Sequence, residues 1–301
     1  MNSMSPISPM SRLCRLLACG ALALAAALPV QAQDAAALKA RHAALRDDLA
    51  SNVFQRPLVL ESSEGADRLQ GDVFARIDHP FSVVGAALKA GPRWCDILIL
   101  HLNVQQCRAG TSSGEDTLHL VIGQKHDQPF NQAYRFAFDF KVASSRPDYL
   151  QLRLNADEGP LGTSDYRIVL EVAALDARRS LLRLSYAYRF GTAARMAMQA
   201  YMATVGRHKV GFSIVGRAPD GQPHFVGSTR GAIERNTMRY FLAIESYLAT
   251  WTLPPGRQLE TRLDDWHTRV ERYPRQLREL ERHEYVAMKR EQVRRQRAHG
   301  P

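Results

Sequence analysis

The sequence has few cysteines and carries none of the short motifs that mark common enzymes. It has four cysteines in 301 residues, with no CxxC pair and no clustered Cys/His spacing of a zinc site. HExxH, a glycine-rich phosphate loop and a GxSxG nucleophile elbow are also absent, since GFSIVG at 211–216 has one residue too many. The motifs therefore predict no catalytic residue, metal or cofactor.

Histidines are scattered and match no ligand or acid/base pattern. Four lie in one half of the chain, with aspartates at 78, 96 and 127: His79, His101, His119 and His126. We interpret them as surface residues, with an acid/base pair or a metal site as the alternative.

Only one apolar run is long, and it lies at the N-terminus. Residues 1–15 carry Arg12 and Arg15 without an acid, residues 16–30 are largely apolar, and Val30-Gln31-Ala32 has small residues at the cleavage positions. This pattern is typical of a secretory signal peptide, and the run is shorter than the roughly 20 residues of a spanning helix. We expect cleavage after Ala32 and a periplasmic protein, with an uncleaved anchor as the alternative. A lipobox at Cys19 is disfavoured because that cysteine starts the apolar stretch.

Acidic residues are outnumbered by basic ones. The formal net charge is +10, and loss of Arg12 and Arg15 leaves +8. A basic surface favours anionic partners such as lipid head groups, while export argues against nucleic acid. The apolar stripe of the C-terminal helices fades beyond Glu284, so we expect the last dozen residues to protrude or fray. The segment 289–297 has five bases and one acid, which suits contact with an anionic membrane surface.

Two cysteines remain after cleavage, Cys95 and Cys107. Cysteines in an oxidising compartment usually pair. Along one straight helix the two would lie about 18 Å apart, too far for a bridge. We therefore predict a disulfide and a chain reversal between them, with two buried thiols as the alternative.

The middle of the chain alternates apolar and polar residues with the period of half-buried strands. Segments of this kind occupy 68–78, 118–122, 134–141, 150–154, 166–173 and 182–189. Short turn-rich connections between them predict an antiparallel sheet with one apolar face. Gly71 is in phase with the apolar set and predicts a bulge.

Helical periodicity surrounds these strands. We expect helices at 34–50, 81–89, 94–100, 192–205 and 231–251, a hairpin around Pro219-Asp220-Gly221, and helices over 259–297 broken near Pro274. The fold class is therefore α+β, an antiparallel curved sheet gripping a long helix, with extra C-terminal helices.

This order resembles the START-like superfamily, also called SRPBCC or polyketide cyclase/dehydrase-like. The segment Arg76-Ile77-Asp78-His79-Pro80-Phe81-Ser82-Val83-Val84-Gly85-Ala86-Ala87-Leu88, followed by Trp94, is similar to its strand-to-helix opening, and the long helix at 231–251 to its closing helix. The helix and hairpin at 192–227 and the tail depart from the simple form. We divide the chain into a signal peptide (1–32), an N-terminal helix (33–55), a START-like domain (56–252) and a C-terminal helical extension (253–301).

The resemblance implies an apolar ligand enclosed between the sheet and the long helix. Candidate lining residues are Phe136, Phe138, Leu152, Ile168, Leu170, Leu184, Tyr186, Met198 and Met202. The alternative is that these residues simply pack together. Arg235 and Arg239 are a repulsive i,i+4 pair that needs an acid or an anion nearby, with Asn236 and Glu245 as helpers, and we assign them to an anionic head group at the pocket mouth. The other interpretation of this pair is a solvated helix face.

We therefore predict a periplasmic binding or carrier protein for a hydrophobic or amphipathic small molecule, a lipid above all. An enzyme on the same fold, cyclase- or hydrolase-like, is the second interpretation. A scaffold that binds membrane or protein through its basic helices, without a pocket, is the third.

Overall fold

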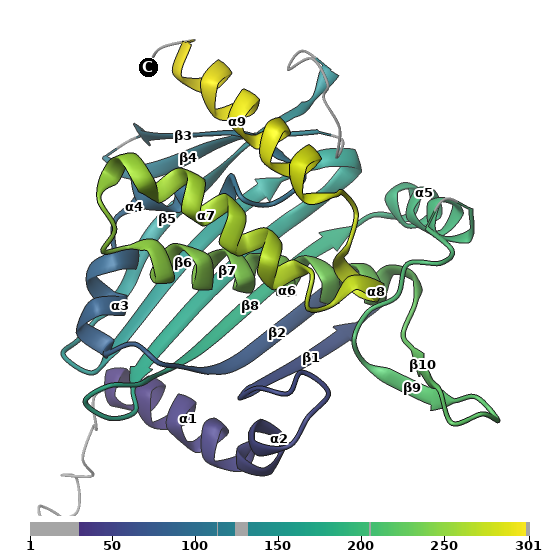
Figure 1. Cartoon of the computed structure of the whole chain (residues 1–301), viewed down its shortest axis with the longest axis horizontal. Helices are drawn as coiled ribbons and strands as arrows, with labels where there is room; N and C mark the ends of the chain where they lie inside the picture. The colour runs from purple at the N-terminus through teal and green to yellow at the C-terminus, as the bar shows by residue number, and fades with distance from the viewer. Residues whose placement is uncertain (1–29, 113, 124–131, 205, 299–301) are drawn as a thin grey trace, which may run out of the picture.

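The fold is built on one antiparallel sheet of eight strands. The computed structural model describes residues 30–112, 114–123, 132–204 and 206–298 (Figure 1); the predicted signal peptide lies almost wholly outside this range. The strand order is β1-β2-β8-β7-β6-β5-β4-β3. The bounds are β1 (Leu58–Glu64), β2 (Arg68–Ile77), β3 (Val104–Ser112), β4 (Glu115–Ile122), β5 (Tyr134–Ser145), β6 (Tyr149–Glu158), β7 (Thr163–Ala174) and β8 (Ser180–Phe190).

One face of the sheet carries the long helix α6 (Ser228–Thr250), with α3 (Phe81–Leu88), α4 (Gly91–Leu98) and α7 (Pro255–Val270) on the same side (Figure 1). Apolar residues of the strands and of α6 belong to one buried cluster. This arrangement confirms the predicted α+β fold, a sheet that grips a long helix.

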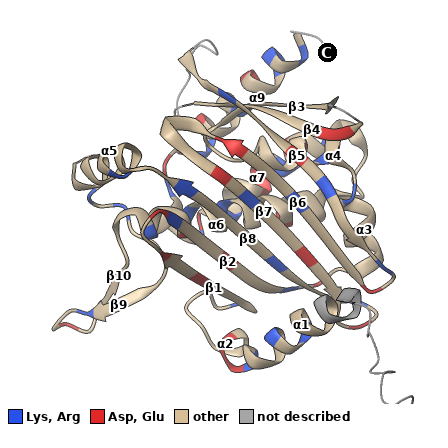
Figure 2. Cartoon of the chain, turned by 180° about the vertical axis from the view of Figure 1, so that it is seen from behind, with Lys and Arg blue, Asp and Glu red and all other residues tan. Residues whose placement is uncertain are grey.

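Two short helices cover a corner of the opposite face. They are α1 (Val30–Ala44) and α2 (Arg46–Ala50), and Figure 2 shows most of this face without a covering helix. Phe74, the apolar residue out of phase in β2, packs here against Leu45 and Leu49. Phe74, which breaks the apolar/polar alternation of β2, thus lies where the N-terminal helices dock.

Gly71 does not mark a bulge, contrary to our prediction. The pairing of β2 with β1 and β8 runs through it without a register shift. A Cβ at this position would overlap the Thr237 hydroxyl of α6. The glycine is required because the helix backbone approaches the sheet closely there.

The predicted disulfide between Cys95 and Cys107 is confirmed. Cys95 lies in α4 and Cys107 in β3, and the reversal between these elements brings their Cα atoms to 5.0 Å. The bridge ties α4 to the edge strand.

The C-terminal extension docks on the domain. Contrary to our prediction, the last dozen residues do not protrude as far as the structure describes them, since Gln296 is bonded to the domain. It consists of α7, α8 (Pro274–Leu277) and α9 (Arg282–Ala298). In α9, the Tyr285 hydroxyl donates to Leu100 O at 2.9 Å, and Lys289 Nζ donates to His101 O and Val104 O at 2.8 Å each. Near its end, Gln296 Oε1 accepts the Cys107 N–H at 3.0 Å. No helix within the described ranges has both the length and the apolar character needed to cross a membrane.

The Lys289→Met variant is expected to lose about 1–3 kcal/mol of unfolding free energy. Two buried carbonyls, of His101 and Val104, lose their donor, and an unsatisfied buried polar group costs about this much. Urea unfolding measures the effect. The control is Arg290→Met, which removes only an exposed ion pair with Glu260 and should change stability by less than about 1 kcal/mol. Equal stability of Lys289→Met and wild type would contradict the proposed anchoring role.

Candidate functional site

A pocket of about 330 Å³ opens between the N-terminal half of α6 and the sheet. Its wall is formed by strands β4, β5, β7 and β8 and by helix α6. The loop after α4, the 3₁₀ turn η2 (Pro160–Gly162), and helix α5 (Thr192–Ala203) with the loop that follows it complete the wall. The lining residues are His101, Asn103, Ile122, Phe136, Phe138, Pro160, Leu161, Tyr166, Tyr186, Tyr201, Met202, Lys209, Ala232, Arg235, Asn236, Arg239 and Tyr240.

Aromatic rings form the wall on the sheet side. Tyr166 stacks on Tyr188 with ring centroids 5.1 Å apart, and Tyr186 contacts Tyr240 edge-on at 5.4 Å. The Tyr166 hydroxyl is 2.7 Å from Thr163 Oγ1. A Cβ at Gly159 would overlap the Tyr166 ring, so the glycine is needed for this ring position. The wall is apolar over most of its area but has phenol groups among its rings.

Burial keeps these phenols protonated. It raises the pKa of Tyr166 to about 12 and the pKa of Tyr186 well above its usual value. Burial also raises the pKa values of Tyr188 and Tyr240. At neutral pH this wall therefore carries no negative charge and offers hydroxyl groups as donors.

Arg235 is a buried cation that lines the pocket. Arg235 is 4% exposed, and its Nη1 atom has no hydrogen-bond partner among the described residues. Burial, together with the nearby Arg239 charge, lowers the pKa of the Arg235 guanidinium to about 10. The group is still cationic at neutral pH, so within the described ranges it is a desolvated charge without an ion pair.

The acid near this pair comes from the C-terminal extension. Glu279 Oε1 accepts from Arg239 Nη2 at 3.0 Å, and Glu279 Oε2 pairs with Lys209 Nζ at 3.0 Å. Arg239 Nη2 also donates to Leu277 O at 3.2 Å. The Glu279 carboxylate thus pairs with two cations. The cluster of Arg235, Arg239, Lys209 and Glu279 therefore keeps an excess of positive charge.

Glu234, next to Arg235, is occupied elsewhere. It accepts from the Phe212 N–H at 2.6 Å, from the Ser213 N–H at 2.9 Å and from the hydroxyls of Ser62 and Ser213. These bonds fix the loop after α5 against β1 and α6. The Glu234 carboxylate is therefore saturated and forms no ion pair with Arg235.

Leu161 stands at the mouth in a backbone conformation that side chains rarely adopt. Its φ is 61° and its ψ is 30°, and its side chain is 68% exposed. A non-glycine residue in the left-handed region costs on the order of 1–3 kcal/mol, and such residues cluster at binding sites. The turn therefore presents an apolar side chain to solvent at the pocket entrance.

The structure brings together six of the predicted site residues. Phe136, Phe138, Tyr186, Met202, Arg235 and Arg239 all line the pocket. Leu152, Ile168, Leu170 and Leu184 lie instead in the buried core and do not line it. Met198 packs against that core. The space under most of α6 is filled, so the hollow is confined to one end of the sheet.

The arginine pair does not lie on a solvated face, and Glu245 does not help to satisfy it. Glu245 pairs with Arg56 and Arg269. Sequence reasoning missed Glu279, which lies 40 positions beyond Arg239. It also missed Tyr166 as a wall residue and interpreted His101, which lines the pocket, as a surface group.

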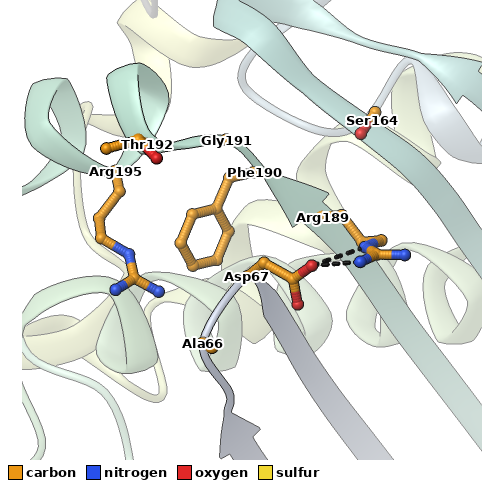
Figure 3. Close-up of a pocket in the computed structure, with 8 residues that line it drawn as sticks. All are labelled: Ala66, Asp67, Ser164, Arg189, Phe190, Gly191, Thr192 and Arg195. Atoms are coloured by element: carbon orange, nitrogen blue, oxygen red, sulfur yellow. Dashed lines mark hydrogen bonds and ion pairs between the residues drawn. The ribbon is translucent and has the colours of Figure 1, made fainter.

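Other features of the described residues are weaker candidates. A hollow of about 350 Å³ lies at the end of β8, where Asp67 pairs with Arg189 and the Phe190 ring lies between that pair and Arg195 (Figure 3). Asp67 and Arg189 are half exposed and already paired with each other, and Arg195 lies on the Phe190 ring. No cluster of three or more His, Cys, Asp or Glu suited to a metal occurs in the part of the chain that the structure describes.

The chain matches no family model and no curated protein. Solved structures with a similar arrangement include norcoclaurine synthase from Thalictrum flavum, with 9% identity and a TM-score of 0.34 over 48% of this chain and 91% of that one. An aromatase/cyclase from a Streptomyces species has 11% identity and a TM-score of 0.30, over 67% and 96%. Ara h 8.0201 has 10% identity and a TM-score of 0.36, over 61% and 99%. These values describe a distant likeness in architecture, which assigns no ligand or reaction to this chain.

We expect stability to fall as pH rises from about 10 to about 12, the range between the unfolded and folded pKa values of Tyr166. The unfolded state loses the phenol proton first, so it binds fewer protons than the folded state and is favoured as pH rises. Tyr166 alone contributes about 2–3 kcal/mol to this loss. Urea unfolding and phenolate absorbance, followed across this range, measure it. Titration of every tyrosine near pH 10 in the folded protein would contradict a dry tyrosine wall.

Replacement of Arg235 by Met should raise the unfolding free energy by about 0.5–2 kcal/mol, because it removes an unpaired buried charge and keeps the apolar stem. Thermal and urea unfolding measure the change. Arg262→Met is the matched control, since Arg262 is equally buried but has partners in Thr250, Gln258 and Asp96. That control should lose stability. A destabilised Arg235→Met variant would show that Arg235 has a structural role.

Proposed function

We propose that the protein binds an amphipathic anion, with the apolar part against the aromatic wall and the acidic head on Arg235. The single observation that supports this is the buried guanidinium beside a pocket whose described lining residues include no carboxylate. Removal of a cation from water is costly unless a charge and hydrogen bonds replace the water. A carboxylate or phosphate head would supply both.

The wall supports a compact apolar part. Ligand pockets usually have volumes of about 300–1,000 Å³, so 330 Å³ is at the small end. Phe136, Phe138 and the tyrosines offer ring faces and edges, and Met202 offers a flexible side chain. We propose a single-chain lipid such as a fatty acid as the ligand class, since one acyl chain suits a pocket of this size.

We further propose that this binding takes place outside the cytoplasm, in the periplasm. The charged, apolar and small-residue zones of residues 1–32 support export. The Cys95–Cys107 bridge supports an oxidising compartment, because disulfides are rare in the reducing cytosol.

An enzyme on the same fold is the second candidate, and His101 is the observation in its favour. Its ring lines the pocket and stacks on Tyr240 at 4.7 Å, and its Nδ1 accepts the Asn103 N–H at 3.2 Å. A histidine beside tyrosine hydroxyls is suited to acid/base chemistry. Mass spectrometry of a ligand after incubation with the protein distinguishes the two candidates, because a carrier returns it unchanged.

Dodecanoate is a suitable probe, with dodecanol as the uncharged analogue of equal chain length. We expect the mature protein to bind dodecanoate more tightly than dodecanol in titration calorimetry. Arg235→Met should weaken dodecanoate binding by about 10- to 100-fold, since hydrogen bonds to charged groups contribute about 1.5–3 kcal/mol. Dodecanol binding should change little.

Arg290→Met supplies the matched control, because it removes an equal charge from a residue that does not line the pocket. It should leave both affinities unchanged. Equal affinity of the wild type for dodecanoate and dodecanol, or equal loss in both variants, would refute the head-group assignment.

A further inference from the structure

One long segment of the chain is basic and contains no acid. Residues 189–219 include five Lys or Arg and no Asp or Glu, although the chain has 30 acidic residues in 301. The segment comprises the end of β8, helix α5, and the hairpin strand β9 (Ile214–Arg217), which pairs with β10 (Pro223–Phe225). The next residue, Asp220, is an exposed acid in the turn between β9 and β10, so the excess of positive charge lies on α5 and β9.

The same segment exposes apolar side chains. In α5 only Ala194 is buried, while Met196 is 65% and Tyr201 42% exposed. In β9, Val215 is 55% exposed. Helix α5 and the hairpin both project beyond the sheet from the same edge of the molecule (Figures 1 and 2). Apolar side chains beside Lys and Arg are typical of helices that lie in a membrane interface.

Three of the five basic residues are not neutralised by ion pairs. Arg195, Arg207 and Arg217 form no salt bridge with a carboxylate in the described ranges, whereas Arg189 and Lys209 are paired with Asp67 and Glu279. Arg195 rests on the Phe190 ring at 5.3 Å (Figure 3). Their charges are available to an anionic surface.

In the tail, where we predicted a membrane contact, most of the basic residues are paired or buried. Arg290 pairs with Glu260, and Arg294 and Arg295 pair with Glu291. Lys289 is buried. Of the tail bases in the described ranges, Arg297 forms no salt bridge and Arg294 and Arg295 share Glu291, against three unpaired arginines at the α5 edge. The larger number of unpaired arginines favours the α5 edge as the membrane contact.

We infer that α5 and the β9–β10 hairpin dock on an anionic lipid bilayer. Tyr201 and Met202 of α5 also line the pocket, so docking would place the pocket entrance at the lipid surface. This inference goes beyond the proposed function and holds whatever the pocket binds. An apolar ligand would then pass between membrane and pocket with little exposure to water.

The test is sedimentation of the mature protein with vesicles of phosphatidylcholine containing roughly one third phosphatidylglycerol. Wild type should bind these vesicles, bind pure phosphatidylcholine weakly, and lose binding as salt rises. The variant Arg195→Gln/Arg207→Gln should bind about 30-fold more weakly, on the order of fivefold per charge. Met196→Gln should lose about tenfold through lost apolar burial.

The matched control is Arg290→Gln/Arg294→Gln, which removes two charges from the tail and should bind as wild type does. Circular dichroism verifies that every variant is folded. Equal losses in the two double variants, equal binding to neutral vesicles, or no binding of wild type would each overturn the inference. None of these results affects the proposed function, because dodecanoate binding is measured without vesicles.

Discussion

The contact between α6 and the sheet determines where the protein is packed and where it is hollow. At Gly71 the helix approaches the sheet so closely that no side chain fits between the two backbones. Along most of its length the apolar residues of helix and strands belong to one core. Where Arg235 and Arg239 of its N-terminal half lie opposite aromatic rings of the sheet, the packing leaves a pocket.

The buried arginines differ in the same way between the packed part of the protein and the pocket. Buried arginines elsewhere have partners, as Arg262 has with Thr250 and Asp96. At the pocket, one carboxylate, Glu279, is shared by Arg239 and Lys209, and Glu234 is held by backbone and hydroxyl groups. Arg235 forms no ion pair with any residue that the structure describes. A site that costs stability in this way is the kind that a bound anion would stabilise.

The C-terminal extension is part of this site as well as a cover for the fold. It supplies Glu279, and through Lys289 it holds the carbonyls of His101 and Val104, next to the pocket wall. The disulfide ties the same region to the edge strand. One end of the pocket is therefore held by segments that are far apart in the sequence.

Much of the sheet was predictable because its strands are half-buried and alternate strictly, as in 166–173. The disulfide was predicted from the expected oxidising compartment and from the two cysteines left after the expected cleavage. The filled core was not predictable, since Leu170 and Phe138 have the same pattern whether they meet a helix or a void. Glu279 and the docking of α9 depend on tertiary contacts across 40 to nearly 200 positions. Periodicity carries no signal of these contacts.

The central claim is that Arg235 and the tyrosine wall hold an anionic amphiphile. Native mass spectrometry of the protein purified from the cells that naturally produce it, beside Arg235→Met prepared in the same way, tests it most directly. The account predicts a copurifying acidic lipid on wild type that is depleted from the variant. A clean apo mass for wild type across preparations, or the same adduct on both proteins, would contradict it.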